Sequence, residues 1–324
     1  MKRKKGLDDL RIAAAFAVVI FHVMGSSVHN DPAVPAELAH TLDRCKAMLQ
    51  WPVPVFFMIT GFLWLRSEKE CTFSKVLPGI RRFVLVLFTV GWAYALMERV
   101  FIARLFSLQL LLSSLGDVFT GQLWDHMWYL YAAIGVYLIL PVLKPFFDTQ
   151  PVRRQGMLCA LLWCFNILAP FLEEYFGYRL PVNFPLGAPL FYVCTGGTLA
   201  RLTFSRRTAA AASFVFLAGS FLCTVGADPA LLTSLTAPAL FIAVTGFAAE
   251  RTSSAGLSWL ARCTFGIYLF QQFFINLMIK ALRLYPLRYP AVPALLLASV
   301  LVFLFALAAT ALLRRIPVVR KYLL

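Results

Sequence analysis

Charged residues are few in this chain. Lys, Arg, Asp and Glu make up only 14% of its 324 residues, whereas hydrophobic residues account for 60%. An average soluble domain carries about 25% charged residues, so the composition excludes an ordinary soluble protein of this size. Apolar runs of about 20 residues, the length that crosses a bilayer core as a helix, recur from end to end. The sequence therefore predicts a single integral-membrane domain over residues 1–324.

The chain also lacks the signatures of several enzyme classes. It contains no H-E-x-x-H, no Walker A loop and no G-x-S-x-G elbow, so metalloprotease, nucleotide-hydrolase and serine-hydrolase chemistry have no support. Its seven cysteines include no C-x-x-C pair, and we predict that they serve packing and that no metal is bound. The net charge of +15 comes from clusters between apolar runs, so we expect no nucleic-acid partner.

Ten apolar runs predict an all-α, polytopic membrane bundle of about ten transmembrane helices. The predicted helices begin near Asp9, Leu49, Phe83, Leu123, Gly156, Pro185, Thr208, Leu231, Leu257 and Pro290. Pro- and Gly-containing loops separate them, among them residues 29–44. One alternating set of loops holds 20 of the 30 Lys and Arg residues and the other holds eight. Because basic loops stay on the cytoplasmic side, we expect both termini there and a retained first helix.

Arg11 and His22 stand at the two ends of an otherwise apolar run, residues 10–23, in the first predicted helix. They are eleven residues apart, which is three turns plus about 20°, so they share one stripe of the helix at a rise of about 16 Å. His29 continues this stripe. Ionisable groups within a membrane-spanning helix usually face a bundle interior or a wet cavity, and they are functional candidates. Two plainer interpretations stay open: an interfacial Arg11 that marks topology, and a His22 hydrogen-bonded in the core.

Four stretches spread along the chain carry a family resemblance. They are LDDLRIAAAFAVVIFHV (7–23), VPVFFMITGFL (53–63), HMWYLYAAIGVYLILPVL (126–143) and FGIYLFQQ (265–272). In this order they resemble the integral-membrane acyltransferase 3 family, which acylates bacterial glycans, lipids and related cell-envelope molecules. The resemblance implies that His22 is the family's essential imidazole and Arg11 its paired basic residue. Family members often have His where this chain has Gln271, so an amide here replaces an imidazole.

Acyl transfer from a thioester to a hydroxyl needs a base, stabilisation of the oxyanion and a place for the donor. His22 suits the base, and whether it deprotonates the acceptor or carries the acyl group itself stays open. The phosphates of an acyl-CoA donor need cations on the cytoplasmic face. We predict Arg11, His22 and His126 as catalytic residues, Arg11, Lys75, Arg81 and Arg82 as donor-binding cations, and Thr60, Trp128, Tyr129, Tyr268 and Gln271 as acceptor-binding residues.

These residues and the resemblance imply an O-acyltransferase of the bacterial cytoplasmic membrane. Its predicted partners are acyl-CoA, with acetyl-CoA the expected donor, an envelope glycan or lipid-linked acceptor, and membrane lipids. A transporter or flippase for a small polar molecule or an envelope precursor is the main alternative. Against it, the chain has neither a repeated half nor the deep carboxylates that many ion-coupled carriers use. A third possibility is a scaffold without activity in an envelope-synthesis complex.

Overall fold

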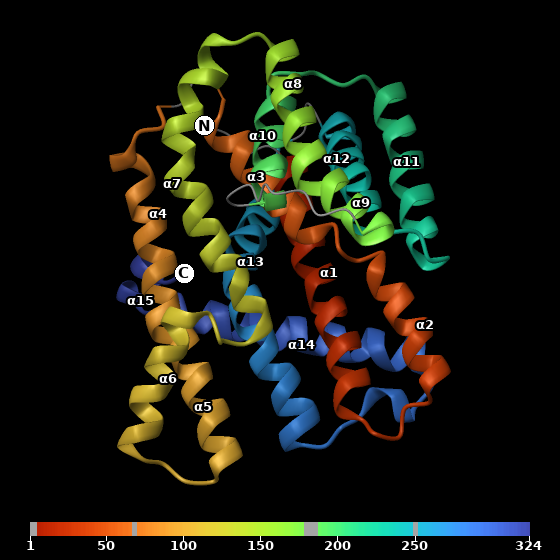
Figure 1. The fold of residues 1–324 in the computed structure, drawn as a ribbon. Coiled ribbons are helices and arrows are strands. Elements are labelled where there is room, and N and C mark those ends of the chain that lie inside the picture. Colours follow the sequence, from red (N-terminus) through yellow and green to blue (C-terminus); the bar gives the residue numbers. More distant parts are fainter. Residues whose placement is uncertain (1–4, 67–69, 178–186, 249–251) are drawn as a thin grey trace.

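The computed structural model describes residues 5–66, 70–177, 187–248 and 252–324, and this part of the chain is built from helices (Figure 1). The first half contains α1 (Lys5–Asn30), α2 (Ala36–Ala47), α3 (Pro52–Trp64), α4 (Phe73–Val86), α5 (Trp92–Ala103), α6 (Leu108–Thr120) and α7 (Trp128–Thr149). The second half contains α8 (Val152–Trp163), α9 (Ala169–Phe176), α10 (Gly187–Leu199), α11 (Arg206–Thr224), α12 (Pro229–Phe247), α13 (Ala255–Asn276), α14 (Ala291–Leu313) and α15 (Pro317–Tyr322). Three short π-helical turns interrupt or extend these helices. η1 (Leu87–Gly91) joins α4 to α5, η3 (Cys164–Leu168) joins α8 to α9, and η4 (Leu277–Ala281) follows α13.

Eight helical stretches of the described residues are long and apolar enough to cross a membrane. They are Lys5–Asn30, Ala36–Trp64, Phe73–Phe101, Asp125–Thr149, Val152–Phe176, Arg206–Thr224, Pro229–Phe247 and Ala291–Leu313. These match eight of the ten predicted spans. The other two predicted spans, near Pro185 and Leu257, correspond to α10, of which 13 residues are described, and to α13, which is not among the eight. The all-helical, multi-pass prediction is confirmed, whereas the side on which the termini lie stays a prediction.

Two predicted boundaries are wrong. The predicted loop at residues 29–44 contains most of α2, because Leu38, Leu42 and Cys45 recur at helical spacing and pack against a core of α1, α13 and α14. The third predicted helix begins ten residues early, at Phe73, because Val76 and Ile80 already face the core one turn apart. The polar side chains between these apolar positions concealed both helices in the sequence.

Side-chain caps fix the starts of four helices. The side chains of Ser107, Ser205, Asp228 and Ser254 each accept a hydrogen bond from the backbone N–H three residues further on. Such a cap satisfies one of the N–H groups that have no partner within the helix and contributes about 0.5–2 kcal/mol. These short polar residues therefore mark where α6, α11, α12 and α13 begin.

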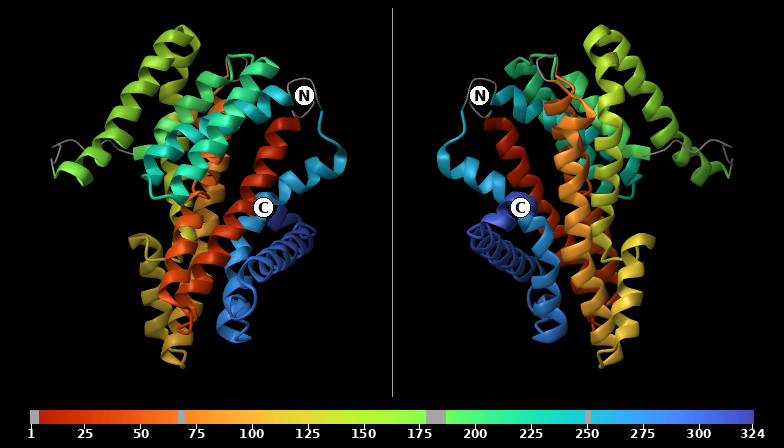
Figure 2. Two further views of the ribbon diagram at one scale, coloured as in Figure 1. Left: turned by 90° about the vertical axis from the view of Figure 1, so that its right-hand side faces the viewer. Right: turned by 90° about the vertical axis from the view of Figure 1, so that its left-hand side faces the viewer.

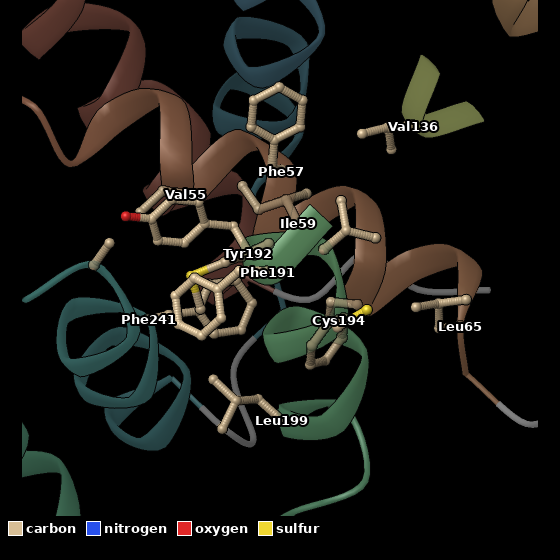
Figure 3. Packing of buried hydrophobic residues seen from close by; sticks show 14 of the residues in the cluster. Val55, Phe57, Ile59, Leu65, Val136, Phe191, Tyr192, Cys194, Leu199 and Phe241 are labelled. Carbon is tan, nitrogen blue, oxygen red and sulfur yellow. The ribbon is translucent and has the colours of Figure 1, made fainter. Parts of the chain in front are cut away.

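α3 and α10 cross at close range inside the largest apolar cluster (Figure 3). A Cβ atom on Gly61 would lie 1.9 Å from the carbonyl oxygen of Val193, and one on Gly196 would lie 2.0 Å from that of Met58. The two glycines therefore allow backbone-to-backbone contact, as small residues do between membrane helices. Figure 3 shows the side chains that surround the crossing, among them Phe57 of α3, Phe191 of α10 and Phe241 of α12.

α1 is the central helix of the bundle. It packs against α3, α12, α13 and α14, and its residues Val19 and Val23 belong to a second apolar cluster with Ile267 of α13 and Val302 of α14. In Figure 1, α1 runs along the bundle and α14 runs across it, and the side views of Figure 2 accordingly show the dark-blue α14 nearly end-on. Arg11 and His22 of α1 therefore lie on a helix that is packed among other helices.

An ion pair joins the loop after α1 to the segment before α14. The carboxylate of Asp31 accepts two hydrogen bonds from the Arg288 guanidinium, both 3.1 Å long, and one from the backbone N–H of Ala33, also 3.1 Å. The guanidinium also lies 4.3 Å from the ring centroid of Tyr285. The hydrogen bond from Arg288 lowers the pKa of Asp31 below its ordinary value of 3.8.

The close helix crossing makes Gly196 sensitive to a single methyl group. We expect Gly196→Ala to lower the free energy of unfolding by about 1–3 kcal/mol, because the new Cβ must push α10 away from α3. Gly156→Ala on α8 is the matched control, since a Cβ there meets no other atom within 4 Å. Thermal unfolding of the purified protein in detergent measures both. Equal melting temperatures for the two variants would contradict the backbone contact.

The lowered pKa of Asp31 predicts how its contribution to stability depends on pH. A carboxyl whose folded-state pKa lies below its unfolded value stabilises the fold above the unfolded pKa, and this contribution is lost as the pH falls through the folded value. Asp31→Asn should therefore be less stable than the wild type near neutral pH, and the difference should shrink below about pH 4. Melting temperatures from about pH 3 to 7 test this, with exposed Glu37→Gln as control. A difference that is the same at every pH would refute the linkage.

Candidate functional site

Two imidazoles meet inside the bundle. His22 lies on α1, and His126 lies on the 3-10 turn η2 (Asp125–Met127) that precedes α7. Their ring centroids are 6.2 Å apart and their planes form an angle of 71°. His126 is only 3% exposed, and neither of its ring nitrogens forms a hydrogen bond of regular geometry among the residues that the structure describes, although the backbone carbonyl of Leu269 interacts with the ring. The fold thus brings together the two histidines that the sequence predicted as catalytic.

Aromatic side chains surround His126 and fix its position. The ring centroids of Tyr94, Trp124 and Tyr268 lie 6.1, 6.3 and 5.4 Å from that of His126. The Tyr268 hydroxyl donates a hydrogen bond to the backbone carbonyl of His126, and the Tyr94 hydroxyl donates one of 3.0 Å to the carbonyl of Leu269. Both bonds tie the neighbourhood of His126 to α13. Tyr268 is one of the predicted site residues, and Trp124 directly precedes η2, two residues before His126. Tyr94 of α5 was not predicted, because no local signal in the sequence connects α5 with η2.

His22 lies where two cavities meet. The larger has a volume of about 1140 Å³ and the smaller about 340 Å³, and Phe21, His22 and Trp128 line both. The ionisable side chains in the lining of the larger cavity are His22, His29, Lys46, Glu98, Arg99, Asp117, Asp125, His126 and Lys280. The elements around it, namely α5, α6 and the C-terminal parts of α1 and α13, lie at the end of the bundle opposite the start of α1 (Figure 1). The smaller cavity is lined mainly by apolar side chains.

Several charges in the larger cavity are paired with each other. Arg99 donates two hydrogen bonds of 2.6 Å to the carboxylate of Asp117. Glu98 accepts a 2.5 Å hydrogen bond from the indole N–H of Trp124, and its carboxylate lies 3.6 Å from the ammonium of Lys280. These pairs neutralise one another yet keep donors and acceptors on the cavity wall. The wall therefore suits a neutral, polar molecule with several hydroxyl groups.

Arg11 lies three turns before His22 on α1, beside a buried carboxylate. Its guanidinium is 3.5 Å from Asp8, which is 1% exposed and accepts a 3.2 Å hydrogen bond from the Ser258 hydroxyl. Sequence analysis missed Asp8, although a position three residues before Arg11 places it on the same helix face. Arg11 also lies in the neighbourhood of Tyr129 and Tyr137 of α7.

The three predicted donor-binding cations of α4 occupy different environments. Lys75 and Arg81 are exposed, whereas Arg82 is half-buried. The Arg81 guanidinium lies 5.3 Å from the ring centroid of Tyr322, and Arg82 lies in the neighbourhood of Tyr137, as Arg11 does. None of the three α4 cations lines either of the two cavities.

The predicted acceptor-binding residues also occupy different environments, some at the cavities or the histidine pair and others away from them. Trp128 lines both cavities, and Tyr129 contacts Tyr268 with ring centroids 5.6 Å apart. Thr60 donates its hydroxyl to the carbonyl of Phe56 within α3 and lines neither cavity. Gln271 is fully buried away from both cavities, and its amide oxygen and nitrogen have no hydrogen-bond partner within the described ranges.

These features define a class, a multi-pass helical membrane protein with a histidine pair beside an internal polar cavity. Residues 4–313 match the profile of the acyltransferase 3 family, described as an acyltransferase domain. The chain belongs to this family and is thereby a transferase of acyl groups. The match confirms the resemblance carried by the four sequence motifs. No curated protein and no solved structure matched the chain.

The unsatisfied amide of Gln271 predicts an unusual response to substitution. Because a buried amide without partners costs about 1–3 kcal/mol, Gln271→Leu should be at least as stable as the wild type. Gln155 provides the matched control, since it is equally buried but donates two hydrogen bonds to backbone carbonyls. Gln155→Leu should lose about 1–3 kcal/mol. Thermal unfolding in detergent compares them, and a strong destabilisation by Gln271→Leu would mean that its amide is bonded after all.

Proposed function

We propose that this membrane acyltransferase moves an acyl group from cytoplasmic acyl-CoA to a hydroxyl of a cell-envelope glycan or lipid-linked sugar. The proposed location is the bacterial cytoplasmic membrane. One observation carries the proposal: His22 borders a polar cavity large enough for a sugar-sized acceptor and faces the buried imidazole of His126 at 6.2 Å between ring centroids. A base beside a cavity rich in hydrogen-bonding groups is the arrangement that O-acylation requires.

In the proposed reaction His22 acts as the general base. It takes the proton of the acceptor hydroxyl while the hydroxyl oxygen attacks the thioester carbonyl carbon. The new carbon–oxygen bond forms, the carbon–sulfur bond breaks, and the proton passes from His22 to the departing thiolate. His126 is suited to hold the attacking hydroxyl, because neither ring nitrogen forms a hydrogen bond of regular geometry within the described residues. The backbone carbonyl of Leu269 interacts with the ring and leaves the second nitrogen for the hydroxyl. Tyr268 and the aromatic neighbours keep the His126 imidazole in place.

The two substrates would approach His22 from opposite ends of α1. The larger cavity lies at the end away from the start of α1, and we assign it to the acceptor on the outer side. Arg11 and Arg82 lie towards the other end, where their charges suit the phosphates of the donor. A catalytic group between two aqueous faces lets the acyl group pass outwards while the CoA stays in the cytoplasm.

His22 should be required for the reaction. Removing a general base lowers the reaction rate about 10²–10⁴-fold. The His22→Ala variant should therefore label the envelope from acyl-CoA at least 100-fold more slowly than the wild type in native membranes. Mass spectrometry measures this rate. His40→Ala, an exposed histidine of α2, is the control and should retain full activity. Equal expression and melting temperature establish that the variant folds.

Three outcomes would contradict parts of this proposal. Undiminished labelling by His22→Ala would remove His22 from the reaction. Accumulation of acylated His22 in the absence of acceptor would replace the base by a covalent relay. Uptake of a polar solute that is independent of acyl-CoA, with no labelling from any donor, would favour the transporter.

A further inference from the structure

We propose that the smaller cavity binds the hydrocarbon chain of the transferred acyl group, and that the donor is an acyl-CoA of about four to eight carbons rather than acetyl-CoA. This inference rests on the proposed function. The cavity draws its apolar walls from several helices, with Val18 of α1, Val53 and Phe57 of α3 and Tyr192 of α10 among them. Its volume of about 340 Å³ falls within the range of small-molecule sites, about 300–1,000 Å³.

The position of the cavity points to an acyl chain. The reacting carbonyl must lie beside His22, and the alkyl chain is bonded directly to that carbonyl carbon. A pocket for the chain must therefore begin at His22, as this one does, with Phe21, His22 and Trp128 shared between the two cavities. Val18 lies one turn before His22 on the same helix face, so the apolar wall continues from the imidazole itself.

The larger cavity is polar and the smaller one is apolar, and this difference assigns the acceptor to the larger cavity and the acyl chain to the smaller one. The larger cavity carries acids, bases and amides, which match an acceptor with many hydroxyl groups. Placing such an acceptor in the apolar cavity would leave its polar groups without partners. The methyl group of an acetyl donor would occupy only a small part of the apolar cavity and would leave the rest of its walls without contact.

The lipid tail of a lipid-linked acceptor fits this cavity less well. In such a molecule the sugar headgroup lies between the reacting hydroxyl and the tail. The tail therefore cannot begin at His22 while the hydroxyl reacts there. An acyl chain meets this condition because its first methylene is bonded to the reacting carbon.

The test is a competition among donors in one reaction. Native membranes receive equal concentrations of acetyl-, butyryl-, hexanoyl- and octanoyl-CoA, and mass spectrometry measures the ratio of the acyl groups transferred. Each buried methylene strengthens binding about fourfold, so the wild type should transfer butyryl or hexanoyl at least tenfold faster than acetyl. Because the readout is a ratio within one sample, the amount of folded protein cancels.

Two substitutions should fill the cavity without touching His22. Val53→Phe and Ala230→Phe each add bulk to its lining, and Ala230 is exposed at its edge, so that variant should fold. Each should lower the hexanoyl-to-acetyl ratio at least tenfold. Ala103→Phe is the matched control, because Ala103 is also exposed but lines the larger cavity. It should leave the ratio within twofold of the wild type.

The outcomes separate this inference from the proposed function. Transfer of acetyl alone by the wild type, or a chain-length ratio unchanged in both filled variants, would overturn the acyl pocket while leaving the enzyme intact. A change in preference between lipid-linked and soluble acceptors, at a constant chain-length ratio, would assign the cavity to the acceptor's tail and would also overturn it. Absence of transfer from all four donors, with candidate acceptors present, would overturn both proposals.

Discussion

The hydrogen bond from the Tyr268 hydroxyl to the His126 carbonyl holds the site together. This bond joins α13 to η2, the short turn that leads into α7. A turn of three residues is too short to pair its own backbone groups, so η2 needs a hydrogen-bond partner from another element. With η2 fixed, the His126 ring stays beside His22 of α1. The geometry of the histidine pair therefore depends on three segments that lie far apart in the sequence.

The buried polar groups of this protein divide into paired and unpaired ones. Arg99 and Asp117 satisfy each other through two hydrogen bonds. In contrast, the ring nitrogens of His126 and the amide of Gln271 form no hydrogen bond of regular geometry among the described residues, and the same holds for the Ser27 hydroxyl and the Gln155 amide oxygen. A low-dielectric interior makes such groups costly. Of these, His126 lines the larger cavity, where a substrate can satisfy its ring nitrogens, whereas Gln271 lines neither cavity. This difference supports our assignment of His126 to the substrate.

The two walls that meet at His22 differ in chemical character, and this difference underlies the role that we propose for His22. On one side lies a wall of ionisable and amide groups, and on the other lies an apolar wall that includes Val18 and Phe57. A transferred acyl group has both characters at once, with a polar carbonyl and an apolar chain. The imidazole at the boundary of the two environments is therefore well placed for a reaction in which the polar end changes partners and the apolar end stays where it is.

The sequence by itself determined the membrane class, the helical composition, the common stripe of Arg11 and His22, and the family, because these depend on composition, local spacing and motifs. Only the tertiary structure decided which distant residues share the site. It placed Tyr94 of α5 against His126, because aromatic contacts between helices leave no local pattern. It also put Gln271 in a closed core rather than on a cavity wall, because a helix face can point equally to a pocket or to a neighbouring helix. The division into polar and apolar cavities arises from the packing of the helices around α1, which no single stretch of sequence records.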